Sequence, residues 1–289
     1  MQCVAVVFLL HLPWKRHSKD YMDVITRNFL RLLRSGALNE YQQLEPMSAF
    51  KWHRVVDMAR YQGVGGIVAK GMRNHQYDGG GGVPHGVGEL LKSLPPAENP
   101  LPVDETRLSN TILNRRLEAI REEEPQSEEP SEATLELLDV IVANVAATLN
   151  SGLSLSRVLE LGGYLRTSGD KVDFVKLDRW LSHLHIARLA QLHGSVLVEV
   201  FGFDQDEVPF VKYVERSAAR LAAKAICHTA KDTAETWYFR KTRSGFVRNN
   251  SKAIRRNIRR SAAFAKYAPV ETISSFADNA FRSLSEIEE

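Results

Sequence analysis

Cysteine is scarce in this sequence, and the two cysteines that it has lie far apart. Most of the 289-residue chain separates Cys3 from Cys227, so they form neither a metal-binding nor a redox spacing. This distribution argues against the disulfide framework that is typical of small secreted domains. A reducing compartment is therefore the expected environment.

The sequence also lacks an apolar run long enough to cross a membrane. The run from Cys3 to Leu12 is shorter than the about 20 residues that a transmembrane helix needs. A secretory signal places positive charge before its apolar segment, whereas Lys15 and Arg16 follow this one. We therefore predict a cytoplasmic protein. Residues 1–14 are then either the end of a strand or helix or the product of an over-extended start codon.

Charge of one sign does not dominate the chain. The net charge is +3, with 25% charged and 44% hydrophobic residues, which is the ordinary composition of a soluble globular protein. The molecule as a whole is therefore not an obvious polyanion binder. No run of alternating β-branched residues indicates a strand.

The sequence does contain a series of helical patterns, in which apolar residues recur three and four positions apart. The clearest series is Ala133–Leu189, where Asn150-Ser151-Gly152 and Ser168-Gly169-Asp170 separate three helices, the third beginning near Asp173. Further helices are predicted over residues 21–34, 47–61, 67–75, 104–124, 214–230, 250–265 and 270–284.

Three residues mark expected details of the first two helices. Gly36 is a plausible stop for the first helix, since glycine often follows the last helical residue. Ser48 is the expected N-cap of the second helix. Phe50 is expected on its buried side, together with Trp52 and Val55.

These patterns predict an all-α fold, a predominantly α-helical bundle with two packed helical units joined by flexible linkers and little or no β structure. Residues 1–77 form the N-terminal helical unit. Residues 78–132 are a Gly/Pro-rich and acidic linker region with one helix, at about 104–124. Residues 133–289 form the C-terminal helical domain, which carries a basic segment at 240–266. Gly79–Gly82 is expected to be a flexible connection rather than a phosphate loop, because no Gly-Lys-Ser/Thr follows it.

Several short motifs resemble those of a bacterial family of uncharacterised nucleotidyltransferases. An N-terminal motif combines a tryptophan helix with a Gln-x-Val turn, and a C-terminal series follows the order of the family. The matching residues are Trp52, Val55, Ala59, Gln62 and Val64, then Ser151–Arg157, Glu160-Leu161, Val172-Asp173-Phe174, Phe201-Gly202, Pro209 and Tyr267-Ala268-Pro269.

The departures from this family are as informative as the matches. Ser156 replaces the arginine of the family, and Glu160-Leu161 replaces its Asp-Trp pair. Members also carry an α/β core whose Gly-Asp-x-Asp strand binds magnesium, whereas here the acidic linker Glu122–Glu132 leads directly into the C-terminal helices. The resemblance therefore implies a non-catalytic helical relative that lacks the metal-binding carboxylate core, with no assigned catalytic residue and no cofactor.

A second hypothesis is an active magnesium-dependent nucleotidyltransferase. Such an enzyme needs two carboxylates that hold Mg²⁺ and a nearby Gly-Ser turn that receives the nucleotide phosphates. One stretch has this spacing, namely Gly194-Ser195 followed by Asp204 and Asp206. Strand residues around such a pair should be apolar, but Gln205 and Glu207 are polar. Asp204 and Asp206 are thus weak metal candidates, and helix capping by Asp204 is favoured.

Three histidines give no better metal site. His183 and His185 are two positions apart and face different sides of a helix, and His193 lies two turns further on. We predict that all three are packing or surface residues.

The basic segment 240–266 carries the strongest chemical signal in the sequence. No Asp or Glu occurs between Glu235 and Glu271, and aromatic residues are interspersed with the basic ones. The candidate anion-binding residues recur at helical spacing on one face, with the last one beside it. They are Lys252, Arg255, Arg256, Arg259 and Arg260.

This stripe of basic residues leaves two interpretations open. It could neutralise the phosphates of nucleic acid or of acidic lipid, which makes the chain a helical binding module. It could instead be a solvated helix face whose charge the acidic linker and the C-terminal glutamates balance. The partner could accordingly be nucleic acid or another polypeptide.

Overall fold

The computed structural model describes residues 22–75, 86–87, 89, 106–124, 129–226 and 263–285. The described residues contain helices and no strand. The predicted all-α fold is therefore confirmed. No helix within it is long and apolar enough to cross a membrane.

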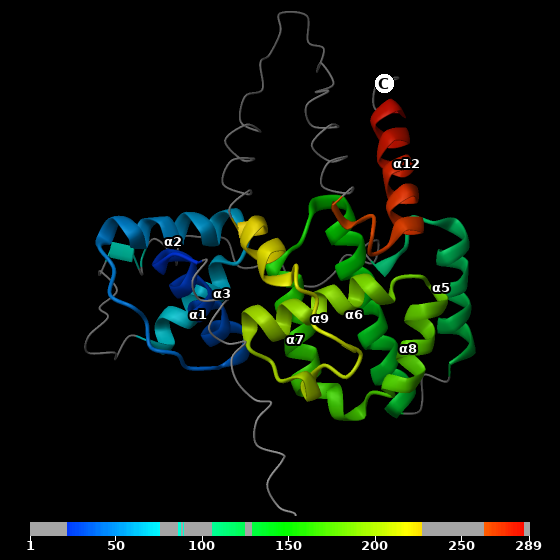
Figure 1. The fold of residues 1–289 in the computed structure, drawn as a ribbon, viewed down its shortest axis with the longest axis horizontal. Helices are drawn as coiled ribbons and strands as arrows, with labels where there is room; N and C mark the ends of the chain where they lie inside the picture. Colours follow the sequence, from blue (N-terminus) through cyan, green and yellow to red (C-terminus); the bar gives the residue numbers. More distant parts are fainter. Residues whose placement is uncertain are drawn as a thin grey trace, which may run out of the picture.

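Three helices form the N-terminal group on the left of Figure 1, namely α1 (Val24–Leu38), α2 (Ala49–Tyr61) and α3 (Gly65–Asn74). Two glycines allow α1 and α3 to pack closely. A Cβ atom at Gly36 would lie 1.9 Å from the carbonyl oxygen of Ile67, and one at Gly71 would lie 2.1 Å from that of Leu32. The expectation that Gly36 stops the first helix is therefore wrong. Asn39, in the left-handed conformation, provides the C-cap instead.

The second group contains α5 (Thr111–Glu123), α6 (Glu129–Ser151), α7 (Leu155–Ser168), α8 (Phe174–His183) and α9 (Ala187–Phe201). It also contains the short 3₁₀ helices η4 (Gly169–Lys171) and η5 (Gln205–Glu207). The long helix α6 is central, since it packs against α7, α8 and α9 (Figure 1).

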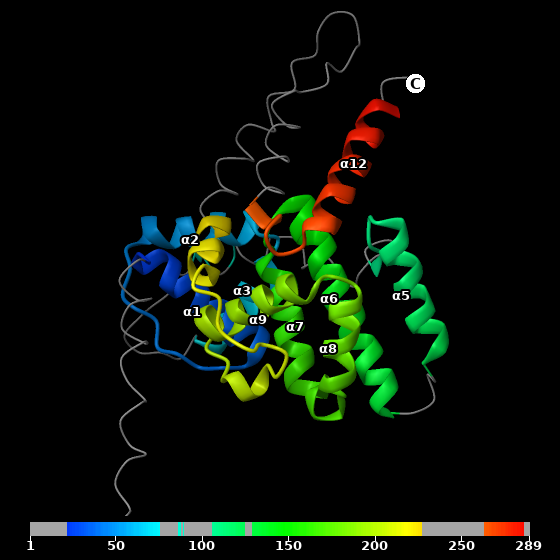
Figure 2. The ribbon, with the colours of Figure 1, turned by 45° about the vertical axis from the view of Figure 1, so that its right-hand side comes forward.

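The last described helix, α12 (Pro269–Ser285), contacts α6 near its own start and extends away from the other helices (Figures 1 and 2). Residues 218–226 are also helical and lie beside the N-terminal group. There the side-chain amide of Gln62 donates a hydrogen bond to the carbonyl of Ala225 at 3.1 Å.

The two groups share one hydrophobic core. Phe29 and Trp52 from the first group and Ile141 and Phe201 from the second belong to the same cluster of buried side chains. Helix α1 contacts both α7 and α9. The domain boundaries at residues 77 and 133 stay predictions.

The predicted helix limits differ from the observed ones at several places, and α5, for example, begins at Thr111 rather than at about residue 104. Helix α6 begins at Glu129 within the acidic linker, where the Thr134 hydroxyl bonds the carbonyl of Pro130. The predicted third helix of the 133–189 series is interrupted, because His185 adopts a positive φ of 56° between α8 and α9. Its predicted start is confirmed, since the Asp173 carboxylate accepts a hydrogen bond from the Lys176 N–H at 2.9 Å.

One predicted core residue lies on the surface. Phe50 is 74% exposed, whereas Trp52 and Val55 on the same helix are fully buried. Residues two positions apart point to different sides of a helix, so Phe50 cannot share the buried face of Trp52. Ser48 is at the N-cap position as expected, although its side chain makes no capping hydrogen bond.

Candidate anion-binding pocket

The first wall of the pocket is built by the chain that follows η5. Val208 and Val211 are buried there, and they pack against Gly194 on α9. A Cβ atom at Gly194 would lie 2.3 Å from a methyl group of Val211, so only glycine permits this contact. The Glu215 N–H then donates a hydrogen bond to the buried Ser195 hydroxyl at 3.0 Å. These contacts hold the chain in place just before the helix of residues 218–226.

The helix of residues 218–226 buries one face and exposes the other. Ala218, Ala222 and Ile226 are buried at a spacing of four residues. Arg216 and Arg220 are exposed, because they are placed two positions away from this apolar stripe.

The second wall comes from residues 264–268. Phe264, Tyr267 and Ala268 are buried, and the Tyr267 and Ser217 hydroxyls form a hydrogen bond of 2.5 Å that joins the two walls. Lys266 is exposed between them, and its ammonium lies 4.5 Å from the centre of the Tyr267 ring. This cation–π contact positions the ammonium without neutralising its charge.

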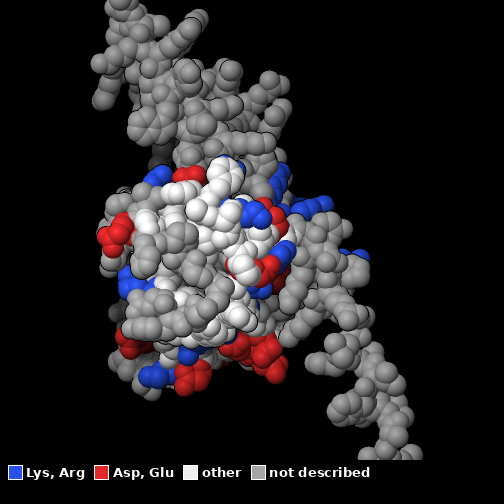
Figure 3. Space-filling view, turned by 90° about the vertical axis from the view of Figure 1, so that its left-hand side faces the viewer, with Lys and Arg blue, Asp and Glu red and all other residues white. Residues whose placement is uncertain are grey.

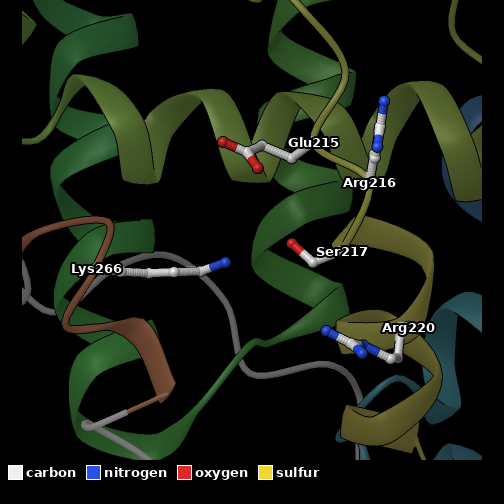
Figure 4. A pocket seen from close by; sticks show the side chains of 5 residues that line it. All are labelled: Glu215, Arg216, Ser217, Arg220 and Lys266. Carbon is white, nitrogen blue, oxygen red and sulfur yellow. The ribbon is translucent and has the colours of Figure 1, made fainter.

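The two walls enclose an open cavity of about 390 Å³, lined by Glu215, Arg216, Ser217, Arg220 and Lys266. In Figure 4, the side chains of Lys266, Ser217 and Arg220 extend toward a common space, whereas Arg216 extends away from it. Three of the five lining side chains are basic and one is acidic.

The basic residues of this anion pocket have no acidic partner within the described part of the chain. They differ in this respect from Arg166 and Arg27, which are held in ion pairs. A fourth cation lies close by, since the Arg188 guanidinium carbon is 5.9 Å from the centre of the Tyr267 ring. Ammonium, guanidinium and hydroxyl donors together suit a phosphate or carboxylate group.

The face of the molecule that α1–α3 present carries a different distribution of charge. Basic and acidic side chains are interspersed over it (Figure 3). This face therefore lacks the excess of basic over acidic residues that lines the anion pocket.

The predicted metal candidates do not form a site. Asp204 is the N-cap residue of η5 and forms a capping box with Glu207, whose carboxylate accepts a hydrogen bond from the Asp204 N–H at 2.8 Å. Asp206 is exposed. In the described ranges, no three His, Cys, Asp or Glu side chains come together in a way that could hold a metal ion. The predicted capping role of Asp204 is confirmed.

The three histidines are surface or packing residues, as predicted. His183 and His185 are exposed, and His193 is completely buried on α9. The His193 Nε2 atom lies 2.9 Å from the Thr148 hydroxyl, so this histidine links α9 to α6.

The candidate anion-binding residues Lys252, Arg255, Arg256, Arg259 and Arg260 lie outside the described residues. Only the end of the basic segment is described, and it forms part of the anion pocket through Lys266. The aromatic residues of that end, Phe264 and Tyr267, are core residues that no ligand can stack upon.

Arg216, Ser217 and Arg220 are site residues that the sequence patterns do not predict. The two arginines are four residues apart within a predicted helix, which predicts a shared face, but Arg216 precedes the observed helix and extends away from Arg220. Nothing in the local sequence could show that Lys266 lies beside them, because 46 positions separate Arg220 from Lys266.

The residues that carry the family resemblance have structural roles. Trp52, Val55 and Val64 are core residues, Gly202 is the left-handed C-cap of α9, and Asp173 caps α8. Any helical protein with these packing and capping needs could carry such residues, so the resemblance rests on weakly specific positions.

Comparisons with protein-family models, with curated proteins and with solved structures found no match to this chain.

Proposed function

We propose that this chain is a helical module that binds nucleic acid at the basic surface around the anion pocket. The observation that carries the proposal is the convergence of Lys266, Arg220 and the Ser217 hydroxyl on one cavity. Unpaired cations at a surface neutralise phosphates and release the counterions that surround them.

The position of the anion pocket in the chain supports this proposal. Lys266 is the last residue of the basic segment 240–266, so the predicted stripe of Lys252 to Arg260 precedes the pocket directly in sequence. We expect the stripe to add contacts along a phosphate backbone that the pocket engages. A cytoplasmic location, which stays a prediction, would give access to such a partner.

Nucleic acid is favoured over an acidic membrane surface by the chemistry of the anion pocket. Membrane-surface binding relies on apolar side chains that enter the lipid beside the basic ones. The lining here is polar or charged throughout and offers no apolar side chain that could enter a lipid.

The resemblance to nucleotidyltransferases gives a second proposal. Under it, the chain is a non-catalytic relative, and the capping contacts of Asp204 and Glu207 support the view that these carboxylates serve the fold. Binding of nucleic acid is compatible with this relation, since it requires no metal-ion chemistry.

Fluorescence anisotropy with a labelled single-stranded oligonucleotide tests the proposed function. Reversing two pocket charges, Arg220→Glu with Lys266→Glu, should weaken binding at least about tenfold and reduce the slope of log Kd against log salt by about 1.4. The matched control is Lys70→Glu with Arg73→Glu, two exposed residues of α3, which should bind like the wild type.

Three outcomes would contradict the proposal. These are a lack of oligonucleotide binding, an equal loss of affinity in the control, and binding to acidic lipid vesicles in place of oligonucleotide. The last outcome would assign the basic surface to a membrane.

A further inference from the structure

Glu215 is the residue of the anion pocket that phosphate binding leaves unexplained. Its carboxylate lines a cavity that is otherwise basic, and one of its oxygens, Oε1, is buried without a hydrogen-bond partner among the described residues. Its backbone is fixed by the hydrogen bond to Ser195. The fold therefore fixes the position of the backbone that carries this carboxylate at the pocket.

An acidic group in this place has a cost unless a ligand uses it. A carboxylate oxygen that is withdrawn from water without a partner is unfavourable, and its charge repels a phosphate bound nearby. Both effects are offset if the ligand presents a hydrogen-bond donor to Glu215 next to its own phosphate.

Nucleotides combine these two features in one molecule. On the basis of the proposed function, we infer that the anion pocket binds one nucleotide of a nucleic acid whose base carries an exocyclic amino group. The phosphate lies against Lys266, Arg220 and Ser217, and the amino group donates to the Glu215 carboxylate. The volume of about 390 Å³ is within the range of about 300–1,000 Å³ that is usual for small-molecule sites.

A comparison of cytosine with thymine distinguishes recognition by Glu215 from simple charge attraction. Cytosine presents the N4 amino donor that Glu and Asp accept in base recognition, whereas thymine presents the O4 acceptor at the same position. The two bases have nearly the same size and carry the same phosphate. Thymine would therefore place an acceptor oxygen against the carboxylate, and cytosine a donor.

The test compares eight-residue oligonucleotides of deoxycytidine and of thymidine at pH 7.5 by fluorescence anisotropy. The wild type should bind the deoxycytidine oligomer about tenfold more tightly, the value of one hydrogen bond to a charged group. Glu215→Gln should abolish this preference, because a side-chain amide donates to thymine O4 as readily as it accepts from cytosine N4.

Asp206→Asn is the matched control, since it removes one negative charge from an exposed position outside the pocket. It should retain the preference for deoxycytidine. Melting temperatures of both variants establish that they are folded.

The two proposals fail in different ways. If both oligomers bind with equal, salt-dependent affinity to the wild type, the role of Glu215 is overturned and nucleic-acid binding stands. A preference that persists in Glu215→Gln also overturns the role of Glu215. If neither oligomer binds, the proposed function itself is wrong.

Discussion

At the scale of single residues, His193 is the side chain whose properties the fold changes most. It is fully buried on α9, where Nε2 lies 2.9 Å from the Thr148 hydroxyl and Nδ1 has no partner among the described residues. Burial lowers the pKa of His193 to about 3, because the charged imidazolium would lose its hydration. The histidine is therefore neutral in the folded protein.

This lowered pKa predicts a loss of stability in acid. The unfolded chain takes up a proton on His193 as the pH falls through about 6.5, whereas the folded protein does so only near the lowered pKa. Above about pH 6.5 His193 causes no loss of stability. Below that pH the protein loses stability progressively as the pH falls toward 3, and the loss is about 2 kcal/mol at pH 5.

The measurement is the melting temperature at pH 7 and at pH 5. His193→Gln does not titrate, so its melting temperature should fall less over this interval than that of the wild type. His183→Gln, at an exposed position, should behave like the wild type. Equal decreases in all three proteins would contradict the prediction.

At the scale of elements, α12 exposes apolar side chains and buries polar ones near its start. Its exposed side chains include Val270, Ile273 and Phe276, whereas Glu271, Thr272 and Ser275 are buried. Polar contacts thus attach the start of this helix to the bundle. The Ser275 hydroxyl donates to the Asn150 side chain at 2.9 Å.

Glu271 is the main attachment point between α12 and α5. Its carboxylate is 1% exposed and accepts hydrogen bonds from the backbone N–H groups of Ser109 and Asn110, the latter at 3.1 Å. Both residues directly precede α5, and Asn110 is the N-cap whose side chain accepts from Ile112 and Leu113. One carboxylate therefore fixes the beginning of a second helix.

We predict that Glu271→Gln destabilises the protein by about 1–3 kcal/mol, since it replaces charge-assisted hydrogen bonds with neutral ones and sets a donor against a backbone N–H. Chemical denaturation measures the change in the free energy of unfolding. The control is Glu122→Gln on the exposed side of α5, for which we expect less than about 0.5 kcal/mol. A similar small effect at both positions would show that Glu271 does not attach the helix.

At the scale of the whole molecule, Arg166 connects the two groups of helices. Its guanidinium on α7 forms ion pairs with Glu40, which follows α1, at 2.5 Å and with Glu207 of η5 at 3.0 Å. It also lies 4.0 Å from the centre of the Phe203 ring. Burial acts to lower the pKa of Arg166, but the hydrogen bonds to Glu40 and Glu207 outweigh this effect and raise it.

Arg166→Met should loosen the N-terminal group without unfolding the bundle. The substitution keeps an apolar chain over Phe203 and removes both ion pairs, so we expect a loss of about 1 kcal/mol for these partly exposed contacts. Hydrogen exchange should accelerate in α1–α3 more than in α6. The exposed Arg179→Met on α8 is the control. A uniform acceleration over both groups of helices would contradict a connecting role for Arg166.

Much of the helical architecture could be predicted from the sequence, because each helix has a local cause. Apolar residues at helical spacing placed α2, α7 and α12 close to their observed limits, whereas α5 begins seven residues later than its pattern predicts. The cap of α8 at Asp173 could likewise be predicted, since its hydrogen bond joins residues only three positions apart.

Little of the anion pocket could be predicted in this way. Lys266 belongs to the basic segment, but its neighbours Ser217 and Arg220 come from residues 217–220, which the sequence does not connect to it. The buried Tyr267 joins these segments through its hydrogen bond to Ser217.

By itself, then, the sequence determined the helical class, most helix positions and the basic character of the segment near the C-terminus, since all of these depend on residues within a few turns of one another. The tertiary structure decided the role of Gly36, which the approach of α3 requires. It also decided which cations share a cavity with Glu215. These properties depend on the packing of segments that are distant in the chain, and local patterns do not record that packing.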